Sequence, residues 1–324
     1  MKKTEIKKIE IKRLWRAELV RLIVVAQFIG LLCLINQATT YAMGNTSAEF
    51  LLIPKAARTS AMAGAASAIA DDSTAIFYNP AGIGFLKEKN VSLSHSEWLE
   101  DINFESISYS MPVKNKFSLG LGFEYLGIGN IQGQESMNSP TRKFNSYDFS
   151  SIVGLSYLFN KNFSVGGAVR YIEEKIDDEK TWAGSFDIGT IYRKKINSHK
   201  NFSLGVTAQN IALKKPQFIA QKEELPTKIV VGGSYKPLGE TLLLSTDLVM
   251  LKNSKPAVNF GCEVLIYDIL KIRSGYKLDP AYETSSRLTL GMGIIFNSLS
   301  VDYAYIPFES LTDTHIFSIN YKFD

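Results

Sequence analysis

The sequence predicts an all-β protein, an antiparallel transmembrane β-barrel of about 14 strands with a short N-terminal hatch inside the lumen. Three observations support this fold class. Apolar residues alternate with small or polar residues over most of the chain, the alternating segments number fourteen, and the last segment closes on the aromatic residue Phe323. An even number of antiparallel strands closes into a barrel without exposed edges, so every backbone group within the membrane is hydrogen-bonded.

Residues 1–42 have the features of a secretory signal peptide. Eight Lys and Arg residues precede an apolar run from Leu22 to Ile35, and Ala42 provides a small residue for cleavage. The run is too short for a helix that spans a bilayer, which needs about 20 apolar residues. We therefore expect residues 1–42 to be removed, and the long charged segment before the run leaves a retained signal anchor open as the alternative.

Residues 43–88 are rich in small residues and show no alternation. Alanine favours helix, whereas Gly64 and the sequence Asn79-Pro80-Ala81-Gly82 interrupt it, so we expect one short helix and a tight turn. The segment is too small to bury a core of its own, and a wide barrel needs its lumen filled to prevent leakage. We therefore expect this segment, the hatch, to lie inside the barrel. Asp71 and Asp72 either hold the hatch by bonding backbone groups or merely cap a helix or turn.

Residues 89–324 form the predicted barrel. In one segment Phe117, Leu119 and Leu121 alternate with Ser118 and Gly120, which indicates a strand with one face toward an apolar medium. The fourteen segments begin near Val91, Asn103, Phe117, Ser146, Phe163, Thr181, Phe202, Thr227, Thr241, Ala257, Ile269, Ser286, Leu299 and Thr314. Short turns such as Asn297-Ser298 are expected at one end of the barrel, and long connections such as Gly127–Asn145 and Lys214–Leu225 at the other.

A soluble β-sandwich also has alternating strands and is the alternative fold. The second face of the predicted strands is small and polar, as a lumen would be, and aromatic residues lie near strand ends, as in the girdles of membrane barrels. These aromatic residues are Tyr125, Tyr171, Trp182, Tyr192 and Phe296. The last strand carries Phe317, Ile319, Tyr321 and Phe323 on one face. Such a strand is the usual address for the outer-membrane assembly machinery, so we expect the bacterial outer membrane and contact with its lipid.

The remaining composition excludes several function classes. The whole chain has a net charge of +4, but eight of its 36 basic residues and three of its 32 acids lie in residues 1–42, so the rest is nearly neutral and gives no argument for nucleic-acid binding. Cys262 is the single cysteine after the signal peptide. The histidines His95, His199 and His315 accompany no ligand-spaced cysteine or acid cluster. We therefore expect no metal, no other cofactor and no enzymatic activity.

Strand parity places a set of charged residues on the lumen side. These are Glu124, Arg170, Asp187, Lys228, Asp247, Glu263, Lys271, Arg273, Lys277, Arg287 and Asp302. Buried charges must pair or meet water, so one interpretation is a cross-paired barrel interior that also anchors the hatch. The functional interpretation is that Lys271, Arg273 and Arg287 hold the anionic head group of a ligand, such as a carboxylate.

The hatch also carries the motifs of a known family. They are Ser47-Ala48-Glu49-Phe50-Leu51, Ala57-Arg58, Ala61-Met62-Ala63-Gly64-Ala65, Ala70-Asp71-Asp72 and Phe77-Tyr78-Asn79-Pro80-Ala81-Gly82. This region resembles the N-terminal region of the PorV/PorQ family of outer-membrane proteins, which is related to the FadL-like transporters of long-chain fatty acids and other hydrophobic compounds. The resemblance implies a fourteen-stranded barrel whose hatch folds inward. It also implies a role in gating or ligand binding for the hatch residues Asp71, Asp72, Phe77, Asn79, Pro80, Ala81 and Gly82.

Two functions follow as expectations. In the first, the barrel passively transports a hydrophobic or amphipathic small molecule, which enters between the wall and the hatch. In the second, similar to PorV-type proteins, the barrel is a non-enzymatic shuttle or binding component that receives exported proteins in a type IX-like secretion pathway. Transport predicts an apolar pocket in the lumen, whereas a shuttle predicts a protein-binding outer rim.

Overall fold

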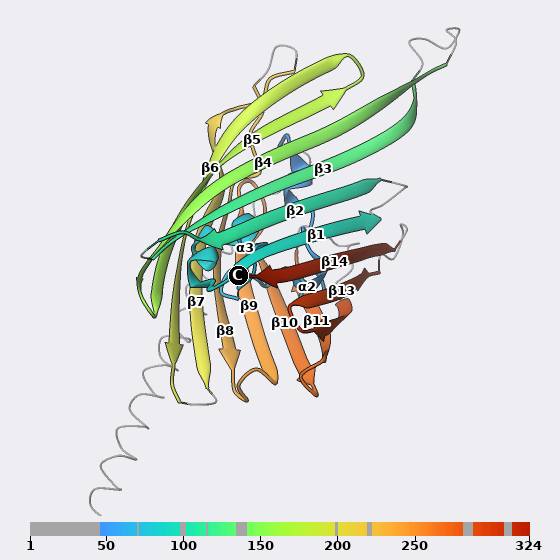
Figure 1. Cartoon of the computed structure of the whole chain (residues 1–324). Coiled ribbons are helices and arrows are strands. Elements are labelled where there is room, and N and C mark those ends of the chain that lie inside the picture. The colour runs from blue at the N-terminus through green and yellow to red at the C-terminus, as the bar shows by residue number, and fades with distance from the viewer. Residues whose placement is uncertain are drawn as a thin grey trace, which may run out of the picture. The chain divides into compact units, whose positions relative to one another are not determined.

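The computed structural model describes residues 46–69, 71–97, 102–114, 116–133, 141–197, 200–218, 222–280, 288–307 and 313–324, and the predicted signal peptide lies outside them. The described residues form a closed antiparallel barrel of fourteen strands, in which β1 pairs with β14 and the other strands pair with their neighbours in sequence (Figure 1). This confirms the predicted fold class and strand number. The strands are β1 (Lys89–Glu97), β2 (Asn103–Pro112), β3 (Phe117–Gly133), β4 (Arg142–Asn160), β5 (Phe163–Ile176), β6 (Glu179–Lys195), β7 (Asn201–Lys214), β8 (Lys228–Lys236), β9 (Leu242–Leu251), β10 (Ala257–Ile266), β11 (Leu270–Leu278), β12 (Leu288–Phe296), β13 (Leu299–Ile306) and β14 (Thr314–Phe323).

The two ends of the barrel differ in their connections. We call the end where β14 finishes the turn end, because it carries turns of two to five residues such as 161–162, 297–298 and 196–200. The opposite end, the loop end, carries the longest connections, including residues 215–227 and 279–287. It also has the two-residue turn 177–178 and the five-residue connections 98–102 and 252–256. This arrangement matches the alternation of short and long connections expected for a membrane barrel.

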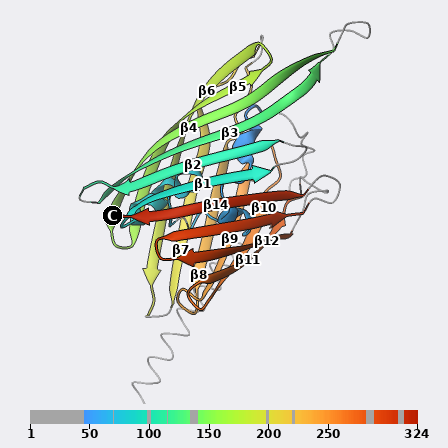
Figure 2. The same ribbon diagram turned by 45° about the vertical axis from the view of Figure 1, so that its right-hand side comes forward.

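Strands β3 to β7 have 14 to 19 residues, whereas the other strands have 8 to 10. Figures 1 and 2 show β3 to β6 projecting beyond the neighbouring strands at the loop end. The long connection predicted at Gly127–Asn145 is therefore wrong in extent, because β3 continues to Gly133 and β4 begins at Arg142. Outside the lipid both faces of a hairpin meet water, so the alternating pattern disappears although the backbone pairing continues.

The two faces of the wall have opposite character. Large apolar side chains such as Leu93, Ile107 and Phe123 point outward and are 46–47% exposed, whereas serines such as Ser94 and Ser108 point inward and are buried. Aromatic rings pair on the outer face near the loop end, Tyr171 with Trp182 at 6.0 Å between ring centroids. Others pair near the turn end, including Tyr192 with Phe202 and Tyr321 with Phe323. The outward positions predicted for Tyr125, Tyr171, Trp182, Tyr192 and Phe296 are confirmed.

The hatch lies inside this barrel as four short elements, which are η1 (Glu49–Leu52), α2 (Ala57–Ser60), α3 (Ala75–Tyr78) and η2 (Pro80–Phe85). Figures 1 and 2 show α2 and α3 surrounded by strands. The prediction of one short helix is wrong, because two α-helices and two 3₁₀ helices replace it. Among the described residues, no helix is long and apolar enough to cross a membrane.

The hatch supplies much of the buried apolar surface. Ile76, Phe77 and Ile83 pack with Ile152 and Ile191 of the wall in one cluster. Phe50 and Leu51 pack with Phe104, Ile172 and Leu225 in a second cluster nearer the loop end. The core of the molecule is therefore the interface between hatch and wall.

Candidate functional site

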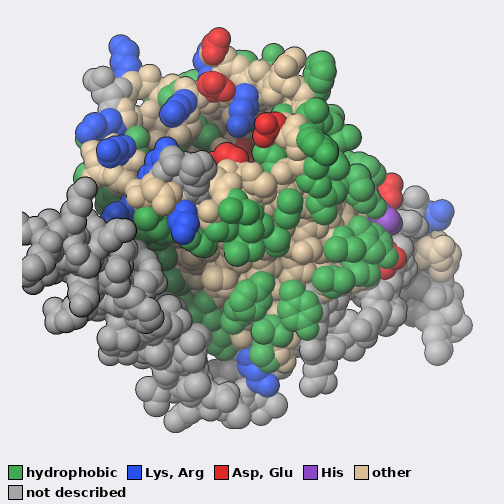
Figure 3. All heavy atoms as spheres, turned by 90° about the horizontal axis from the view of Figure 1, so that it is seen from below, with side chains coloured by type: hydrophobic (Ala, Val, Ile, Leu, Met, Phe, Trp, Pro, Cys, Tyr) green, Lys and Arg blue, Asp and Glu red, His purple; other side chains and the backbone are tan. Residues whose placement is uncertain are grey.

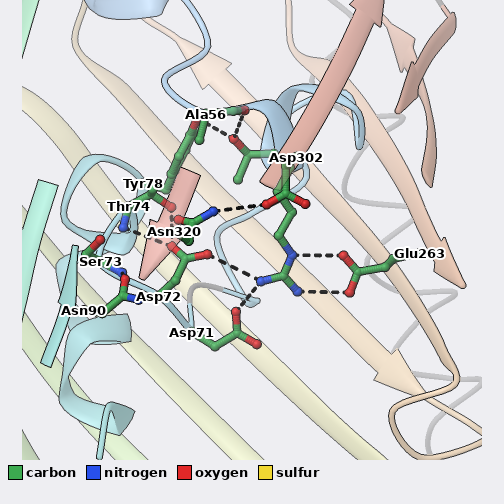
Figure 4. Close-up of polar contacts among 12 residues, drawn as sticks. Ala56, Asp71, Asp72, Ser73, Thr74, Tyr78, Asn90, Glu263, Asp302 and Asn320 are labelled. Atoms are coloured by element: carbon green, nitrogen blue, oxygen red, sulfur yellow. Dashed lines mark hydrogen bonds and ion pairs between the residues drawn. The ribbon is translucent and has the colours of Figure 1, made fainter. Parts of the chain in front are cut away.

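Arg58 of α2 is the centre of an ionic contact between hatch and wall. Its guanidinium donates two hydrogen bonds to the Glu263 carboxylate of β10, at 3.0 and 3.1 Å, as a bidentate pair. The remaining nitrogen, Nη1, lies 2.6 Å from Asp71 and 3.5 Å from Asp72 (Figure 4). A planar guanidinium suits this bridging position, because it offers several donors in a fixed plane. Arg58 thereby joins two separated parts of the hatch to the wall.

The Arg58 contact continues into the wall through alternating charges. Glu263 also accepts a hydrogen bond from Arg273 at 2.6 Å and lies 3.4 Å from the Lys271 ammonium. Arg273 in turn donates to Asp302 at 2.7 Å, and Asn320 donates to the other oxygen of Asp302 at 3.0 Å. Each buried charge therefore faces an opposite charge, which offsets the cost of removing it from water.

The pKa shifts of the hatch groups reflect this surrounding charge. Burial alone would lower the pKa of the Arg58 guanidinium, but the carboxylates of Asp71, Glu263 and Asp72 outweigh burial and raise the pKa. Burial alone would raise the pKa of Asp71, but Arg58 and more distant basic residues lower it well below its usual value. Both groups are therefore charged at neutral pH.

A second ionic contact lies on the opposite side of the hatch. The Lys55 ammonium lies 2.7 Å from Glu124 of β3 and donates to the Phe50 carbonyl at 3.0 Å. Glu124 also pairs with Arg170 of β5, whose guanidinium is 3.7 Å from Asp187. Burial lowers the pKa of Lys55 to about 8, although Glu124 acts in the opposite direction.

The Asn79-Pro80-Ala81-Gly82 turn is fixed to the wall by Asn79. Its side-chain amide donates to the Ser67 carbonyl at 2.9 Å and to the Thr190 carbonyl of β6 at 3.2 Å. Its carbonyl oxygen accepts from the Ala81 amide at 3.1 Å and so caps η2, while Ser164 of β5 donates to the Ala81 carbonyl at 2.8 Å. Asn79 therefore ends α3, begins η2 and binds the barrel. Pro80 and Gly82 are buried within η2.

Several inward-facing wall side chains bind the hatch backbone directly. Asp247 of β9 accepts from the amides of Ala66 and Ser67 at 3.0 and 2.9 Å. Thr289 of β12 donates to the Ala61 carbonyl at 3.0 Å and accepts from the Ala63 amide. These contacts satisfy backbone groups of the hatch that lie outside regular helix.

The end of α3 is held in the same way. Gln209 of β7 donates to the carbonyls of Phe77, at 3.1 Å, and of Tyr78. The Tyr78 hydroxyl accepts from the Lys55 amide at 2.9 Å and is 2.6 Å from the Thr59 hydroxyl, and burial raises the pKa of Tyr78 to about 12.

The structure places the predicted site residues as follows. Asp72 accepts hydrogen bonds from the amide and the hydroxyl of Thr74, two residues later, and so caps a turn, as in the second interpretation given above for Asp71 and Asp72. Asp72 also lies near Arg58. Lys271 and Arg273 face the lumen and contact Glu263, which corresponds to the cross-paired interior rather than to a vacant anion site. Arg287 lies outside the described residues. Their binding of a ligand head group stays a prediction.

Sequence reasoning assigned no role to Lys55, Arg58 or Gln209. Lys55 and Arg58 carried a usable signal, since isolated cations in a small-residue segment that is enclosed by a barrel require acidic partners. Gln209 had no such signal in the sequence, apart from its place on the inward face of a predicted strand. Among the described residues no group of His, Cys, Asp or Glu is arranged to hold a metal ion. His95 lies on the outer face 2.6 Å from Glu105, and His199 lies outside the described residues.

A cavity of about 570–600 Å³ is present at each end of the wall. The cavity at the turn end, 600 Å³ in volume, is bounded by Ala68, Ile69 and Asp71 of the hatch and by basic and aromatic residues of the wall. The wall residues include Lys161, Tyr192, Arg193, Phe202 and Lys236. Figure 3, which shows the molecule from below, has Lys and Arg side chains gathered toward one side, beside a broad hydrophobic surface.

Comparison with known proteins assigns the family. Residues 36–242 match the family model described as type IX secretion system protein PorV, which covers more than half of the chain. The chain belongs to the PorV family. A curated relative, a UPF0164 protein of Treponema pallidum, is 24% identical over 229 residues, which is 65% of this chain and 53% of that protein. The chain thus spans about half the length of the curated relative that it matches.

The barrel is also similar to solved channel structures. The CymD monoaromatic hydrocarbon channel aligns with a TM-score of 0.56 at 12% identity and covers 84% of this PorV-family chain and 98% of CymD. A Pseudomonas aeruginosa FadL homologue gives 0.55 at 13% identity over 84% and 99% of the chains, and the Pseudomonas putida toluene transporter TodX gives 0.54 at 13% over 82% and 96%. At such identity the likeness concerns the fold. The family model is that of a secretion-system protein, and the solved channels share the barrel fold.

Proposed function

We propose that this PorV-family chain is an outer-membrane barrel that lets hydrophobic or amphipathic compounds pass when the hatch moves. The observation that carries the proposal is the way in which the hatch is held. Its backbone bonds to wall side chains such as Asp247, Thr289 and Gln209 instead of adding a strand to the barrel. Breaking these contacts leaves the barrel's own backbone pairing intact, so the hatch is a separable element inside a fixed wall.

The cavity at the turn end supports a route beside the hatch. One side of it is the hatch segment with Ala68 and Ile69, and the other is the rim of the wall, where Tyr192 and Phe202 lie toward the outer face. Lys161, Arg193, Lys194 and Lys195 add positive charge to the same cavity, whereas Lys236 pairs with Glu240 at 2.5 Å. An amphipathic compound with an acidic head finds both apolar and basic surface there, and a short movement of the hatch segment would enlarge the opening.

A disulfide between hatch and wall tests this proposal. The hydroxyls of Ser73 in the hatch and Ser108 in β2 are 2.8 Å apart and buried, so Ser73→Cys with Ser108→Cys places two thiols close to the distance of about 2 Å that a disulfide needs. The change Cys262→Ala removes the remaining cysteine after the predicted signal peptide. The protein is produced in a Gram-negative host without a fatty-acid channel of its own, and uptake of a radiolabelled long-chain fatty acid and of toluene is measured.

We expect uptake above the empty-vector level for the reduced double variant, loss of that uptake after oxidation, and recovery with dithiothreitol. The reduced protein and the single variant Ser108→Cys are matched controls, because both keep the wall substitution without the covalent bond. Uptake that stays at the vector level in every form, or that is unchanged by oxidation, would contradict the proposal.

A second candidate function is a binding component of type IX protein secretion. The family model supports it, and so does the projection of β3 to β6 beyond the loop end, which offers a rim for a protein partner. Replacing residues 129–145 by Asn-Gly removes the tip of the β3–β4 hairpin and leaves the barrel strands in place. If secretion is the function, this variant loses export of partner proteins, whereas the disulfide-locked hatch keeps it.

A further inference from the structure

The cavity of about 570 Å³ at the loop end opens on the outer face of the wall between β6 and β7. The pairing of these strands ends at Gly184 and Lys214, with a register shift beside Gly184. Beyond this point β6 stays paired with β5 but no longer with β7, which turns into the connection 215–227, so a notch forms between β6 and β7. The residues that define it for the argument are Lys180, Trp182, Leu213, Lys214, Lys215 and Lys222.

The notch faces the lipid rather than the lumen. Trp182 and Leu213 point outward and are 48% and 65% exposed, and Trp182 stacks on Tyr171 in the aromatic row of the loop end. Such aromatic rows mark the level where hydrocarbon gives way to lipid head groups. The notch therefore joins the apolar wall to the head-group region of one leaflet.

The charge of the notch is positive. All the ionisable residues that line the notch are lysines. Lys180 pairs with Glu173 at 2.7 Å and Lys215 pairs with Glu224, whereas no ion pair formed within the described residues includes Lys214 or Lys222. The Lys214 ammonium lies 3.0 Å from the centroid of the Trp182 ring.

The notch is held in shape by backbone contacts. The Thr181 hydroxyl donates to the Gln217 carbonyl at 3.0 Å, and the Gln217 amide donates back to it at 2.9 Å. The Glu223 amide donates to the Pro216 carbonyl, and the Ser47 amide of the hatch donates to the Glu224 carbonyl at 2.9 Å. A preformed site binds with a smaller loss of conformational entropy than a mobile loop.

We propose that this notch binds the phosphate-bearing head group of an anionic membrane lipid. The ammonium groups of Lys214 and Lys222 contact the phosphate, and the acyl chain lies along Leu213 and Trp182. A free anion would use only the lysines, whereas a lipid also covers the exposed apolar side chains. The proposal needs only a barrel that lies in a membrane, and it is independent of whether the hatch opens.

The test measures lipid binding to the purified full chain in an uncharged detergent. Phosphatidylglycerol, phosphatidylcholine of equal chain length and inorganic phosphate are titrated separately, and occupancy is read by native mass spectrometry and by Trp fluorescence. The variant Lys214→Gln with Lys222→Gln is compared with Lys143→Gln and Lys255→Gln. The control pair removes the same charge from exposed positions at the same end, outside the notch.

We expect phosphatidylglycerol to bind more tightly than phosphatidylcholine, and the notch variant to weaken phosphatidylglycerol binding by about tenfold or more, since each basic group near a lipid surface contributes appreciably. The control variant is expected to stay within about twofold of the parent. Equal binding by the two variants overturns the proposal, as does inorganic phosphate binding as tightly as the lipid. Compact migration of the unheated barrel in detergent gels verifies that each variant is folded.

Discussion

Two adjacent glycines on β5 allow the fit between hatch and wall to be tested with a single methyl group. Gly166 faces the hatch, and a Cβ built there would overlap the Pro80–Ala81 backbone, at 2.6 Å from the Pro80 carbonyl oxygen. Gly167 faces outward, and its Cβ would find the Asp187 carbonyl oxygen at 3.7 Å, an ordinary contact. Gly166→Ala and Gly167→Ala therefore each add one methyl group to the same strand, but only Gly166→Ala disturbs the hatch.

The expected cost follows from the displacement that the new methyl group forces. An ordinary contact begins at 3.4 Å, and the carbonyl carbon of Pro80 and the Ala81 nitrogen lie closer to the built Cβ than the carbonyl oxygen does, so the turn must move by roughly 1 Å. Overpacking of this kind costs about 1–3 kcal/mol. Asn79 opposes this movement because it fixes the turn to Ser67 and Thr190. At about 2 kcal/mol, the ratio of released to seated hatch rises by ~30-fold, since every 1.4 kcal/mol is tenfold.

The assay reads hatch release as the labelling rate of a cysteine placed at Ser60, whose side chain is buried within α2 at 1% exposure. In a Cys262→Ala background, a water-soluble maleimide reacts only with the introduced thiol of the folded barrel. We expect Gly166→Ala to speed labelling by roughly 30-fold and Gly167→Ala to leave it unchanged. Equal labelling rates for the two variants, whether both label quickly or both label slowly, would refute the claim that the hatch is seated by this close approach.

Three further predictions concern the charges that hold the hatch. Arg58→Met leaves buried carboxylates without their partner and is expected to cost about 3 kcal/mol, measured as faster limited proteolysis of the hatch with unchanged barrel migration. Lys55→Met is expected to have a smaller effect in the same assay, because Arg170 remains beside Glu124. A carboxylate with a lowered pKa stabilises the folded state above its unfolded value, so the Asp71 contribution is complete above about pH 5 and is lost only in strong acid. Because the thiolate is the reactive form, the labelling rate is divided at each pH by that of the same thiol in the unfolded chain. This ratio should be flat from pH 8 to 5 for the parent, and an earlier rise on acidification would contradict this reasoning.

The strands were predictable because membrane and lumen impose a period of two on each of them. Most predicted starts lie within two residues of the observed ones, as at Val91 against Lys89. The largest difference is at β4, predicted from Ser146 and observed from Arg142. That part of β4 lies beyond the aromatic row, where no lipid contact selects alternate side chains and only the backbone pairing keeps the strand extended.

The helices of the hatch were not predictable from alanine content. Helix propensity favours a continuous helix through Ala61 and Ala66, but α2 ends at Ser60 and Gly64 adopts a positive φ of 80°. The wall provides the reason, because Thr289 and Asp247 bind amides that a helix would use internally. Tertiary contacts thus outweigh a preference of a few tenths of a kcal/mol per residue.

Apart from Arg287, which lies outside the described residues, the charged residues of the lumen were predictable as a set but not as pairs. Parity placed Glu263 and Asp302 inside the barrel, yet the hatch partner of Glu263 is Arg58, 205 residues earlier in the chain. Which wall acid meets which hatch cation depends on the stagger between strands and on the path of the hatch, and neither is encoded by alternation. The same limit applies to Lys55 and Glu124.

The small residues of hatch and wall explain why polar contacts contribute to hatch retention beside the apolar clusters. A Cβ at Gly205 would overlap the Ser67 carbonyl, and one at Gly275 would overlap the Met62–Ala63 backbone, so hatch and wall approach each other backbone to backbone. Such contacts exclude water, but each alanine or glycine buries little apolar surface, and hydrophobic stabilisation scales with that area. Ion pairs such as Arg58 with Glu263 therefore add to the apolar clusters around Phe50 and Ile76 in holding the hatch, and removing one partner is costly because a buried charge is left unpaired. Under the proposed function, a compound that competes for these charges would weaken the hold of the wall on the hatch while the strand pairing of the barrel stays in place.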